Sequence, residues 1–399
     1  MVCLRGLIGS VAVCLATGCV APDEEAGGTS TECQEWEVPT IGMHQASVAM
    51  GQDESVWVAS SNHEFTDPNW VLGRYNLHGK SIGTFEVGGP LRDSVGRIAT
   101  GPEPALYVAG RQDDPLEAEY VSVDPVLSRI DVDGTEVWTS AITLDGELLP
   151  GVSDLVVDDG GDIFVVGGAS FPGEEAPPGK YSFVAKYSDD GQREWFDLLF
   201  GSETGSNTAT KVVPDGSGGI YAMGHSAVTL SDEPGAGLLD IWVARYSADG
   251  KREWFTMIGG ALRERVVDSA VDAAGNLYIA AATDPQSGPP DVPLLMKLDP
   301  DGEQMWSIEG DLDATHLTAL ALHPSGNLSA YYQTFDPDSA PSNKTLAMYD
   351  ADGTRLSTRV LDAQVPGWVD ELLVRDDEVY LGDDRAGDGY FLVHLCPET

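Results

Sequence analysis

Three acidic residues hold related places in a pattern that recurs along the chain: Asp154, Asp268 and Glu371. Carboxylate oxygens are the ligands that Ca²⁺ prefers in proteins. If the fold brings the beginnings of these segments to one point, the three side chains can face a common channel. The sequence therefore indicates a candidate calcium site, and calcium is the cofactor that we expect if the protein has one.

Other arrangements that catalyse reactions or bind zinc are missing from the sequence. No G-x-S-x-G motif surrounds a serine. The seven histidines show neither H-x-x-x-H nor H-E-x-x-H spacing, so we expect them at the surface or in turns. Asp-rich turns such as "DVDG" (131–134) and "DPDG" (299–302) lack the ligand order of an EF-hand, and tight turns prefer Asp and Gly in any case.

Two segments of the chain are near copies of each other: "FVAKYSDDGQREWF" (183–196) and "WVARYSADGKREWF" (242–255). Each alternates in polarity on both sides of an Asp-Gly turn, which is typical of a β-hairpin. Looser copies occupy 72–85, 127–138, 295–306 and 346–357.

A second repeat lies between successive copies of the first and is clearest in "SAVDAAGNLYIAAATD" (269–284). Its two apolar runs flank a turn, so it indicates another hairpin. Two hairpins in about 50 residues make a four-stranded unit, and such units repeated radially form the blades of a β-propeller. The other copies begin at Ser47, Arg97, Asp154, Lys211, Ala319 and Glu371.

The second repeat occurs seven times, but the first occurs six times because its last copy is divided between the chain ends. "YFLVHLCPET" at the end supplies one strand, and "CQEWEV" near the start supplies the other. We therefore predict an all-β, seven-bladed β-propeller over 33–399, with the last blade closed by an N-terminal strand. Closure removes the open sheet edges that invite association, so we expect a monomer.

This blade pattern resembles the bacterial seven-bladed β-propeller repeat family. The resemblance is strongest in "LDIWVARYSADGKREWFTMIGG" (239–260) and "VDAAGNLYIAA" (271–281), and it extends over nearly all of 33–399. It implies the propeller fold but no single activity.

The N-terminal region is different in character. Arg5 and the short apolar run that follows it indicate a signal peptide over residues 1–18. The run ends in "LATGC", which resembles the cleavage box of bacterial lipoproteins and implies that Cys19 carries lipid; cleavage without lipid attachment is the alternative. Residues 20–32 are small and acidic, so we expect a flexible tether. Val20 is not a charged retention signal, which favours the outer membrane.

Closure of the ring by the two chain ends also predicts a disulfide. Cys33 and Cys396 are the cysteines that remain once the signal peptide and Cys19 are set aside. Superposed on the intact hairpins, they fall on opposite sides of one tight turn, where a disulfide can form. The exported location permits this bond. In the chain-entropy model it would contribute at most about 4–5 kcal/mol.

Residues that recur around a ring are expected to support the ring. One repeated tryptophan can cover the seam between blades, and one repeated cation can pair with a glutamate on the facing strand. The tryptophans are Trp36, Trp138, Trp195, Trp254 and Trp306, and the cations are Arg74, Arg129, Lys186, Arg245 and Lys297.

Function is expected where the blades differ, in the loops between their second and third strands. These loops share one face of a propeller, and they are long, rich in proline and acidic. A formal charge of −43 without a basic stripe excludes nucleic acid as a partner. The residues that we assign to this acidic loop face are Asp113, Asp114, Glu117, Glu174, Glu175, Asp232, Glu233, Asp383 and Asp384.

The sequence thus predicts a lipid-anchored envelope protein, periplasmic or exposed at the cell surface, that binds or scaffolds through its acidic loop face. A protein, a peptide or a glycan is the expected partner, and the lipid is the expected contact with the membrane. A hydrolase, lyase or lactonase with calcium in the central channel is the rival hypothesis. A purely structural envelope protein is the third.

Overall fold

A computed structural model describes residues 33–40, 47–61, 69–88, 93–112, 125–144, 149–170, 181–199, 207–228, 230, 238–284, 291–310, 312, 316–334, 342–361, 365, 367–385 and 389–397. The strands all belong to the compact unit Gln34–Thr399. Some predicted positions lie outside the described residues, namely Cys19, Asp113, Asp114, Glu117, Glu174, Glu175, Asp232 and Glu233.

The strands form seven antiparallel sheets of four, and each sheet is one blade. Blade 1 contains β2 (Ser47–Met50), β3 (Ser55–Ser61), β4 (Trp70–Asn76) and β5 (Ser81–Val87). Blade 2 contains β6 (Asp93–Thr100), β7 (Ala105–Gln112), β8 (Pro125–Asp131) and β9 (Glu136–Ala141). Blade 3 contains β10 (Leu149–Val157), β11 (Ile163–Ser170), β12 (Tyr181–Tyr187) and β13 (Arg193–Leu199).

The remaining blades follow the same order. Blade 4 contains β14 (Asn207–Pro214), β15 (Ile220–Ser226), β16 (Asp240–Tyr246) and β17 (Arg252–Ile258). Blade 5 contains β18 (Arg263–Val271), β19 (Leu277–Asp284), β20 (Val292–Leu298) and β21 (Gln304–Glu309). Blade 6 contains β22 (His316–Leu322), β23 (Leu328–Thr334), β24 (Ser342–Tyr349) and β25 (Arg355–Val360). Blade 7 contains β26 (Trp368–Arg375), β27 (Glu378–Arg385), β28 (Gly389–Leu395) and β1 (Trp36–Pro39).

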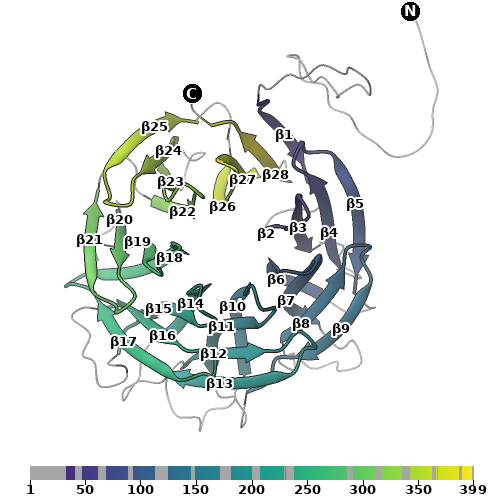
Figure 1. The fold of residues 1–399 in the computed structure, drawn as a ribbon, viewed down its shortest axis with the longest axis horizontal. Coiled ribbons are helices and arrows are strands. Elements are labelled where there is room, and N and C mark those ends of the chain that lie inside the picture. Colours follow the sequence, from purple (N-terminus) through teal and green to yellow (C-terminus); the bar gives the residue numbers. More distant parts are fainter. Residues whose placement is uncertain are drawn as a thin grey trace, which may run out of the picture. The chain divides into compact units, whose positions relative to one another are not determined.

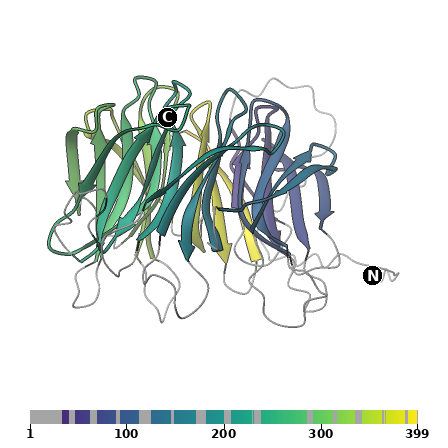
Figure 2. The ribbon, with the colours of Figure 1, turned by 90° about the horizontal axis from the view of Figure 1, so that it is seen from below.

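The blades form a closed ring, which confirms the predicted seven-bladed propeller (Figure 1). The first strand of each blade lies innermost, and the strands run across the thickness of the ring (Figure 2). β1 pairs with β28 in the register Trp36 to His394, so the N-terminal strand completes the last blade. Cys33 and Cys396 are joined in the predicted disulfide. Among the described residues, none forms a helix long and apolar enough to cross a bilayer.

The apolar core is divided among the seams between neighbouring blades. One cluster, for example, packs Phe164 and Val184 of blade 3 against Ile220, Trp242 and Tyr246 of blade 4, all of them buried. A blade is therefore stable only against its neighbours, because one face of each sheet has to be covered by the next sheet.

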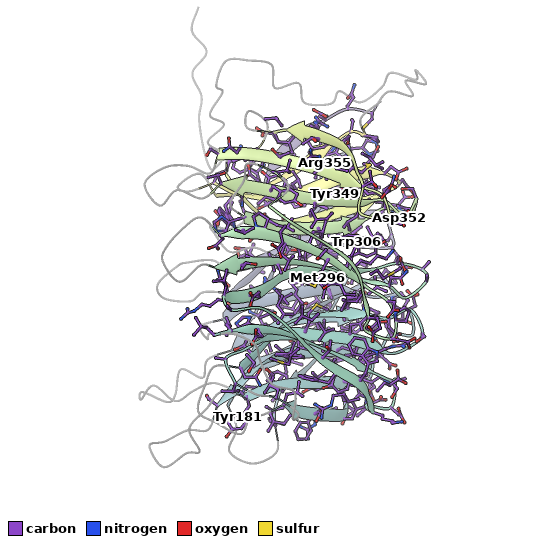
Figure 3. All side chains as sticks on the ribbon, turned by 90° about the vertical axis from the view of Figure 1, so that its left-hand side faces the viewer. Tyr181, Met296, Trp306, Tyr349, Asp352 and Arg355 are labelled. Carbon is purple, nitrogen blue, oxygen red and sulfur yellow. The ribbon has the colours of Figure 1, made fainter. Side chains whose placement is uncertain are left out.

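The repeated tryptophans reach across these seams, as the sequence predicts. In blades 2 to 5, the indole N–H of the outer strand donates to a turn carbonyl of the following blade. Figure 3 labels one of them, Trp306, near Asp352, which directly follows the acceptor residue Ala351. The four pairs are Trp138 to Asp189 at 2.9 Å, Trp195 to Ala248 at 3.1 Å, Trp254 to Pro300 at 2.9 Å and Trp306 to Ala351 at 3.1 Å.

The repeated cations have more partners than the sequence predicts. Lys186 lies 3.0 Å from Glu194, and Arg245 lies 3.5 Å from Glu253, which confirms the cross-strand pairs in blades 3 and 4. Each of these two cations also pairs with an aspartate near the turn that precedes the second strand of its blade. These shorter contacts join Lys186 to Asp162 at 2.7 Å and Arg245 to Asp215 at 2.8 Å.

Candidate functional site

A β-bulge interrupts the innermost strand at the same place in six blades. In β6, for example, the pairing with β7 shifts between Val95 and Arg97, so Gly96 is the extra residue. A bulge of this kind re-aims the side chains beside it. The extra residues are Gly96, Ser153, Thr210, Val267, Thr318 and Asp370.

The residue that follows each bulge lies at the inner end of a seam between blades, and we call this place the inner-seam position. In β2, Ser47 has the corresponding register, because it pairs with Ala59 as Arg97 pairs with Ala109. Charge alternates over four successive blades at this position. Around the ring its members are Ser47, Arg97, Asp154, Lys211, Asp268, Ala319 and Glu371.

Acceptors at the inner-seam position bind the backbone of the next blade. The Asp154 carboxylate accepts from the N–H of Val212 at 3.0 Å, and Asp268 accepts from the N–H of Leu320 at 2.9 Å. Cations at this position also reach the next blade. Lys211 Nζ lies 3.1 Å from Asp268 Oδ1, and Arg97 Nε donates to the carbonyl of Ser153 at 3.1 Å.

The structure therefore places the three predicted calcium ligands beside the channel, together with two cations that the sequence analysis did not select. Arg97 and Lys211 interact electrostatically with Asp154, Asp268 and Glu371. Among the described residues, these three carboxylates do not form a group with every ligand atom within 4.8 Å of the others. Calcium binding by them stays a prediction, and it would compete with the two cations.

A sequence signal for the missed cations was present. Copies of the second repeat begin at Arg97 and Lys211 just as others begin at Asp154 and Glu371, so the column of charged residues is visible in the alignment. Both signs of charge have to be considered, because a bulge followed by a long cationic side chain can reach a channel as well as a carboxylate can.

Protonation in the channel differs from that of ordinary carboxyl groups. Burial raises the pKa of Glu371 from 4.5 to about 8, although Lys211 and Arg97 oppose the shift. The side chain of Asp370 is exposed to the channel, but protein groups surround most of it. This burial raises the pKa of Asp370 to about 6. For Lys211, the neighbouring Asp268 and Asp154 outweigh burial and raise the pKa. Glu371 is therefore mostly neutral at pH 7, while the two cations stay charged.

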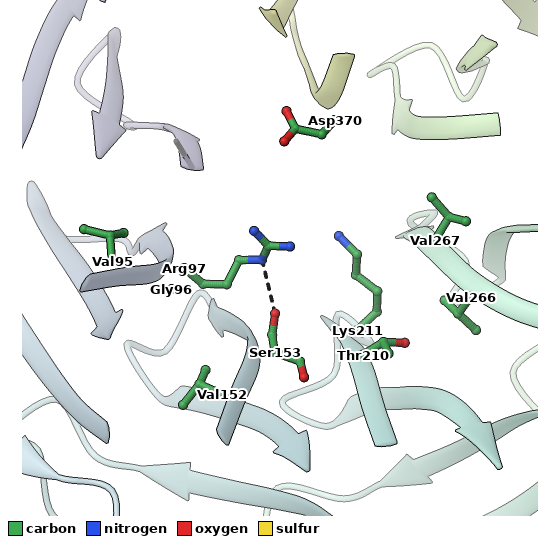
Figure 4. A pocket seen from close by; sticks show the side chains of 10 residues that line it. All are labelled: Val95, Gly96, Arg97, Val152, Ser153, Thr210, Lys211, Val266, Val267 and Asp370. Atoms are coloured by element: carbon green, nitrogen blue, oxygen red, sulfur yellow. Dashed lines mark hydrogen bonds between the residues drawn. The ribbon is translucent and has the colours of Figure 1, made fainter. Parts of the chain in front are cut away.

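The bulges surround a cavity of about 610 Å³ in the centre of the ring. Figure 4 shows Arg97 of β6 and Lys211 of β14 extending into this space, with Asp370 of β26 on the opposite side. Valines from three inner strands line the rest of the wall together with Ser153 and Thr210. A cavity of this size, lined by charged and polar groups together with valines, can hold a small molecule.

The two described residues of the predicted acidic loop face lie in β27 rather than in a loop. Asp383 is fully buried, and its carboxylate accepts from Arg385 Nε at 2.6 Å. The expectation of an exposed position for Asp383 is therefore wrong, because Arg385 compensates its charge inside the blade and lets the strand continue. Asp384 is half-buried.

A second polar constellation, which spacing does not reveal, lies between blades 6 and 7. His323 Nε2 lies 2.7 Å from Ser329 Oγ, and His323 Nδ1 lies 3.2 Å from Asp377 Oδ1. This geometry is that of a serine–histidine–aspartate triad. However, Ser329 is fully buried, and the adjacent cavity measures about 30 Å³, which holds one water molecule rather than a substrate.

The same group has a structural explanation. Ser329 occupies the register position that Tyr278 holds in blade 5, since these residues pair with Met348 and Lys297 respectively. The imidazole of His323 satisfies the serine hydroxyl, which stands where blade 5 has an aromatic side chain. His323 begins the turn between β22 and β23, as the sequence allows, but its side chain is buried in this seam rather than at the surface.

Comparisons with known proteins show the fold and no family. No protein-family model and no curated protein matches the sequence. The chain is similar to the solved structure of polysaccharide lyase Uly1, with 14% identity, a TM-score of 0.52 and coverage of 86% of this chain and 88% of that one. For BBS1N in complex with ARL6DN, identity is 13%, the TM-score 0.52 and coverage 91% and 96%. For puromycin hydrolase the values are 13%, 0.51, and 85% and 50%.

Proposed function

We propose that the protein is a bacterial envelope lipoprotein, built from repeats like those of the seven-bladed family, that binds a cationic partner through an acidic face. The distribution of charge in the ring carries this proposal. Its repeated cations form ion pairs within the ring, as for Arg245 with Asp215 and Lys297 with Asp272. Exposed carboxylates remain in the turns of five blades: Asp133, Asp190, Asp249, Asp301 and Asp352.

Asp133 and Asp249 are ionised at neutral pH. Hydrogen bonds from Thr135 hold the pKa of Asp133 below its ordinary value, and a hydrogen bond from Ser247 does the same for Asp249. With a formal charge of −43, the ring produces a field that attracts cationic molecules and raises their association rate. A protein or peptide segment rich in Lys and Arg, or a basic glycan, matches this field.

We assign the binding site to the acidic loop face rather than to the tight turns. The turn aspartates recur because they stabilise the turn, as Asp249 does by accepting from the Ser247 hydroxyl at 2.5 Å. The loops between the second and third strands differ from blade to blade, and such variable loops on a rigid scaffold are the usual place for a specific site.

Two variants with equal changes of charge test this assignment. The loop variant carries Asp113→Asn, Asp114→Asn, Glu174→Gln, Glu175→Gln and Asp232→Asn. The turn variant carries the Asp→Asn change at positions 133, 190, 249, 301 and 352. Binding of an oligolysine peptide is measured by titration at low and high salt. We expect the loop variant to lose about tenfold more affinity than the turn variant. Equal losses would assign binding to net charge alone and overturn a site on the loop face.

The lipid anchor is tested separately. We expect Cys19→Ser to move the protein from the membrane fraction to the soluble fraction, because acyl chains on that residue would be the anchor. A Cys3→Ser variant is the control, since this residue lies within the predicted signal peptide. Unchanged fractionation of the Cys19 variant would contradict the anchor.

Catalysis in the channel is the second candidate function, and the pKa of Glu371 favours it. A carboxyl group that keeps its proton near pH 7 beside a cavity can act as a general acid. Calcium at the neighbouring carboxylates would support this function. Thermal unfolding in the presence of calcium and in the presence of a chelator tests for metal binding. A large rise in the unfolding temperature with calcium would favour an enzyme. Equal unfolding temperatures would count against a calcium-dependent enzyme.

A further inference from the structure

The central cavity carries opposite charges on opposite walls. Arg97 and Lys211 extend into it from blades 2 and 4, and Asp370 faces them from blade 7 (Figure 4). Asp370 is itself a bulge residue, and it is the acidic member of a set whose other members are Gly96, Ser153, Thr210, Val267 and Thr318. The other five bulge residues are uncharged, so a charged residue is not needed there to build a blade. Asp370 is therefore a candidate for function.

The two cations keep hydrogen-bond donors available to the cavity. Arg97 uses Nε to bond the Ser153 carbonyl, and Figure 4 shows its terminal nitrogens directed into the open space. Within the described residues, no hydrogen bond joins these terminal nitrogens to another group. Lys211 pairs with Asp268 at 3.1 Å, and an ammonium group has three donors, so it can bind a further anion. Together they can hold a carboxylate.

The opposite wall suits a cation. The Asp370 carboxylate accepts from the hydroxyl of Tyr390 at 3.2 Å through Oδ1, which holds the side chain in place while Oδ2 is left for a ligand. Among the described residues that line the cavity, Asp370 is the acidic one, and the neighbouring Glu371 is not part of the lining.

Valines lie between these charges, although polar atoms provide more of the lining surface than apolar atoms do. Val95, Val152, Val266 and Val267 line the cavity, and its volume of about 610 Å³ is in the range of small-molecule sites. We propose that the channel binds a small zwitterion, a free amino acid or dipeptide. Its carboxylate would lie at Arg97 and Lys211 and its ammonium group at Asp370. Such a ligand satisfies both walls without changing the net charge of the channel.

This proposal goes beyond the acidic loop face, because it concerns the axis of the ring. A ligand with one charge would pair with one wall, whereas a zwitterion forms an ion pair at each end. The two ends of a zwitterion therefore contribute separately to affinity, so removal of either end can be measured alone.

The experiment uses calorimetric titration of the full chain with leucine and leucyl-leucine. N-acetyl derivatives remove the positive end, and C-terminal amides remove the negative end. We expect each cap to weaken the better of the two ligands by at least about tenfold. In Asp370→Asn the acetyl cap should have little further effect, and in Arg97→Gln the amide cap should have little further effect. Asp133→Asn, an exposed change far from the channel, should respond to both caps as the wild type does.

Three results would overturn the proposal: no binding of either ligand at about 10 mM, equal affinity for capped and uncapped ligands, or tighter binding of acetate or Ca²⁺ alone. Thermal unfolding establishes that each variant keeps its fold. The loop variant described above should bind leucine normally even if it loses oligolysine, so failure at the channel and failure at the loop face give different results.

Discussion

The carboxylate of Asp154 accepts a hydrogen bond from the backbone N–H of Val212, in the next blade of the ring, at 3.0 Å. Asp268 makes the same contact with Leu320 two seams further along the ring. Two of the carboxylates that the sequence marks as metal ligands therefore also join neighbouring blades. Because the bond crosses a seam, its loss should affect the stability of the whole ring.

Replacement of Asp154 tests this joining role. Asp154→Ala leaves the Val212 N–H without an acceptor and leaves Arg97 without its nearest carboxylate in blade 3, so we expect a loss of about 1–3 kcal/mol in the free energy of unfolding. Asp154→Asn keeps an acceptor oxygen and should lose less. Urea unfolding measures both, with the exposed Asp159→Asn as control. A loss in the alanine variant no larger than in the control would contradict the role.

The raised pKa of Glu371 predicts a specific dependence of stability on pH. The folded protein holds this proton up to about pH 8, whereas the unfolded chain releases it near 4.5. Because the folded state binds more protons between these values, the free energy of unfolding should fall as pH rises from about 4.5 to about 8. Glu371→Gln removes this contribution.

We therefore expect Glu371→Gln to change stability little at pH 5 and to stabilise the protein at pH 9. One unit of pKa difference corresponds to about 1.4 kcal/mol, and channel water screens part of the effect, so we expect a gain of about 1–2 kcal/mol. Chemical denaturation at both pH values measures it. A difference between variant and wild type that does not vary with pH would show that this proton is not coupled to folding.

Much of the fold is predictable because each blade repeats the same two hairpin patterns. The alternation around Asp-Gly turns predicts the outer hairpins, as at β12 and β13, where Gly191 has the positive φ that such a turn requires. The divided seventh hairpin predicts both the β1–β28 pairing and the disulfide, since closure places Cys33 beside Cys396. These features depend on spacing along the chain, which a sequence shows directly.

The site is less predictable because it depends on how the bulges orient side chains. The repeats align Asp154, Arg97 and Lys211 at one position of the inner strand. A register shift of one residue, however, decides which side chains face the channel and which face the seam. Likewise, the sequence pattern predicts that Asp383 lies in an acidic loop, although its partner Arg385 lies only two residues further along the strand. Spacing cannot show that a local ion pair will bury both groups.

The disulfide should stabilise the ring by restricting the unfolded chain. In Cys33→Ser we expect the free energy of unfolding to fall by about 2–5 kcal/mol, with little change in the folded structure. Denaturant unfolding with and without a reductant measures the effect. The wild type in reductant should approach the variant, and the variant itself should not respond. A wild type whose stability is the same in both conditions would contradict a contribution from this bond.

The seams can be tested through a glycine that contacts a tryptophan of the preceding blade. Gly302 has a φ of +85°, and a Cβ added there would lie 3.2 Å from the ring of Trp254. Gly302→Ala should therefore cost about 1–2 kcal/mol for the left-handed backbone and a further amount for the close contact. Gly326 has the same φ of +85° with no atom within 4 Å of its added Cβ, so Gly326→Ala measures the backbone cost alone.

The difference between these two glycine variants isolates the seam contact. In a Trp254→Ala background the ring is absent, so Gly302→Ala should cost no more than Gly326→Ala does. Trp254→Ala alone removes both the packing and the 2.9 Å bond to Pro300, and we expect about 3–5 kcal/mol of destabilisation. If Gly302→Ala were no more costly than Gly326→Ala in the wild type, the tryptophan would not be packed against the next blade as the structure shows.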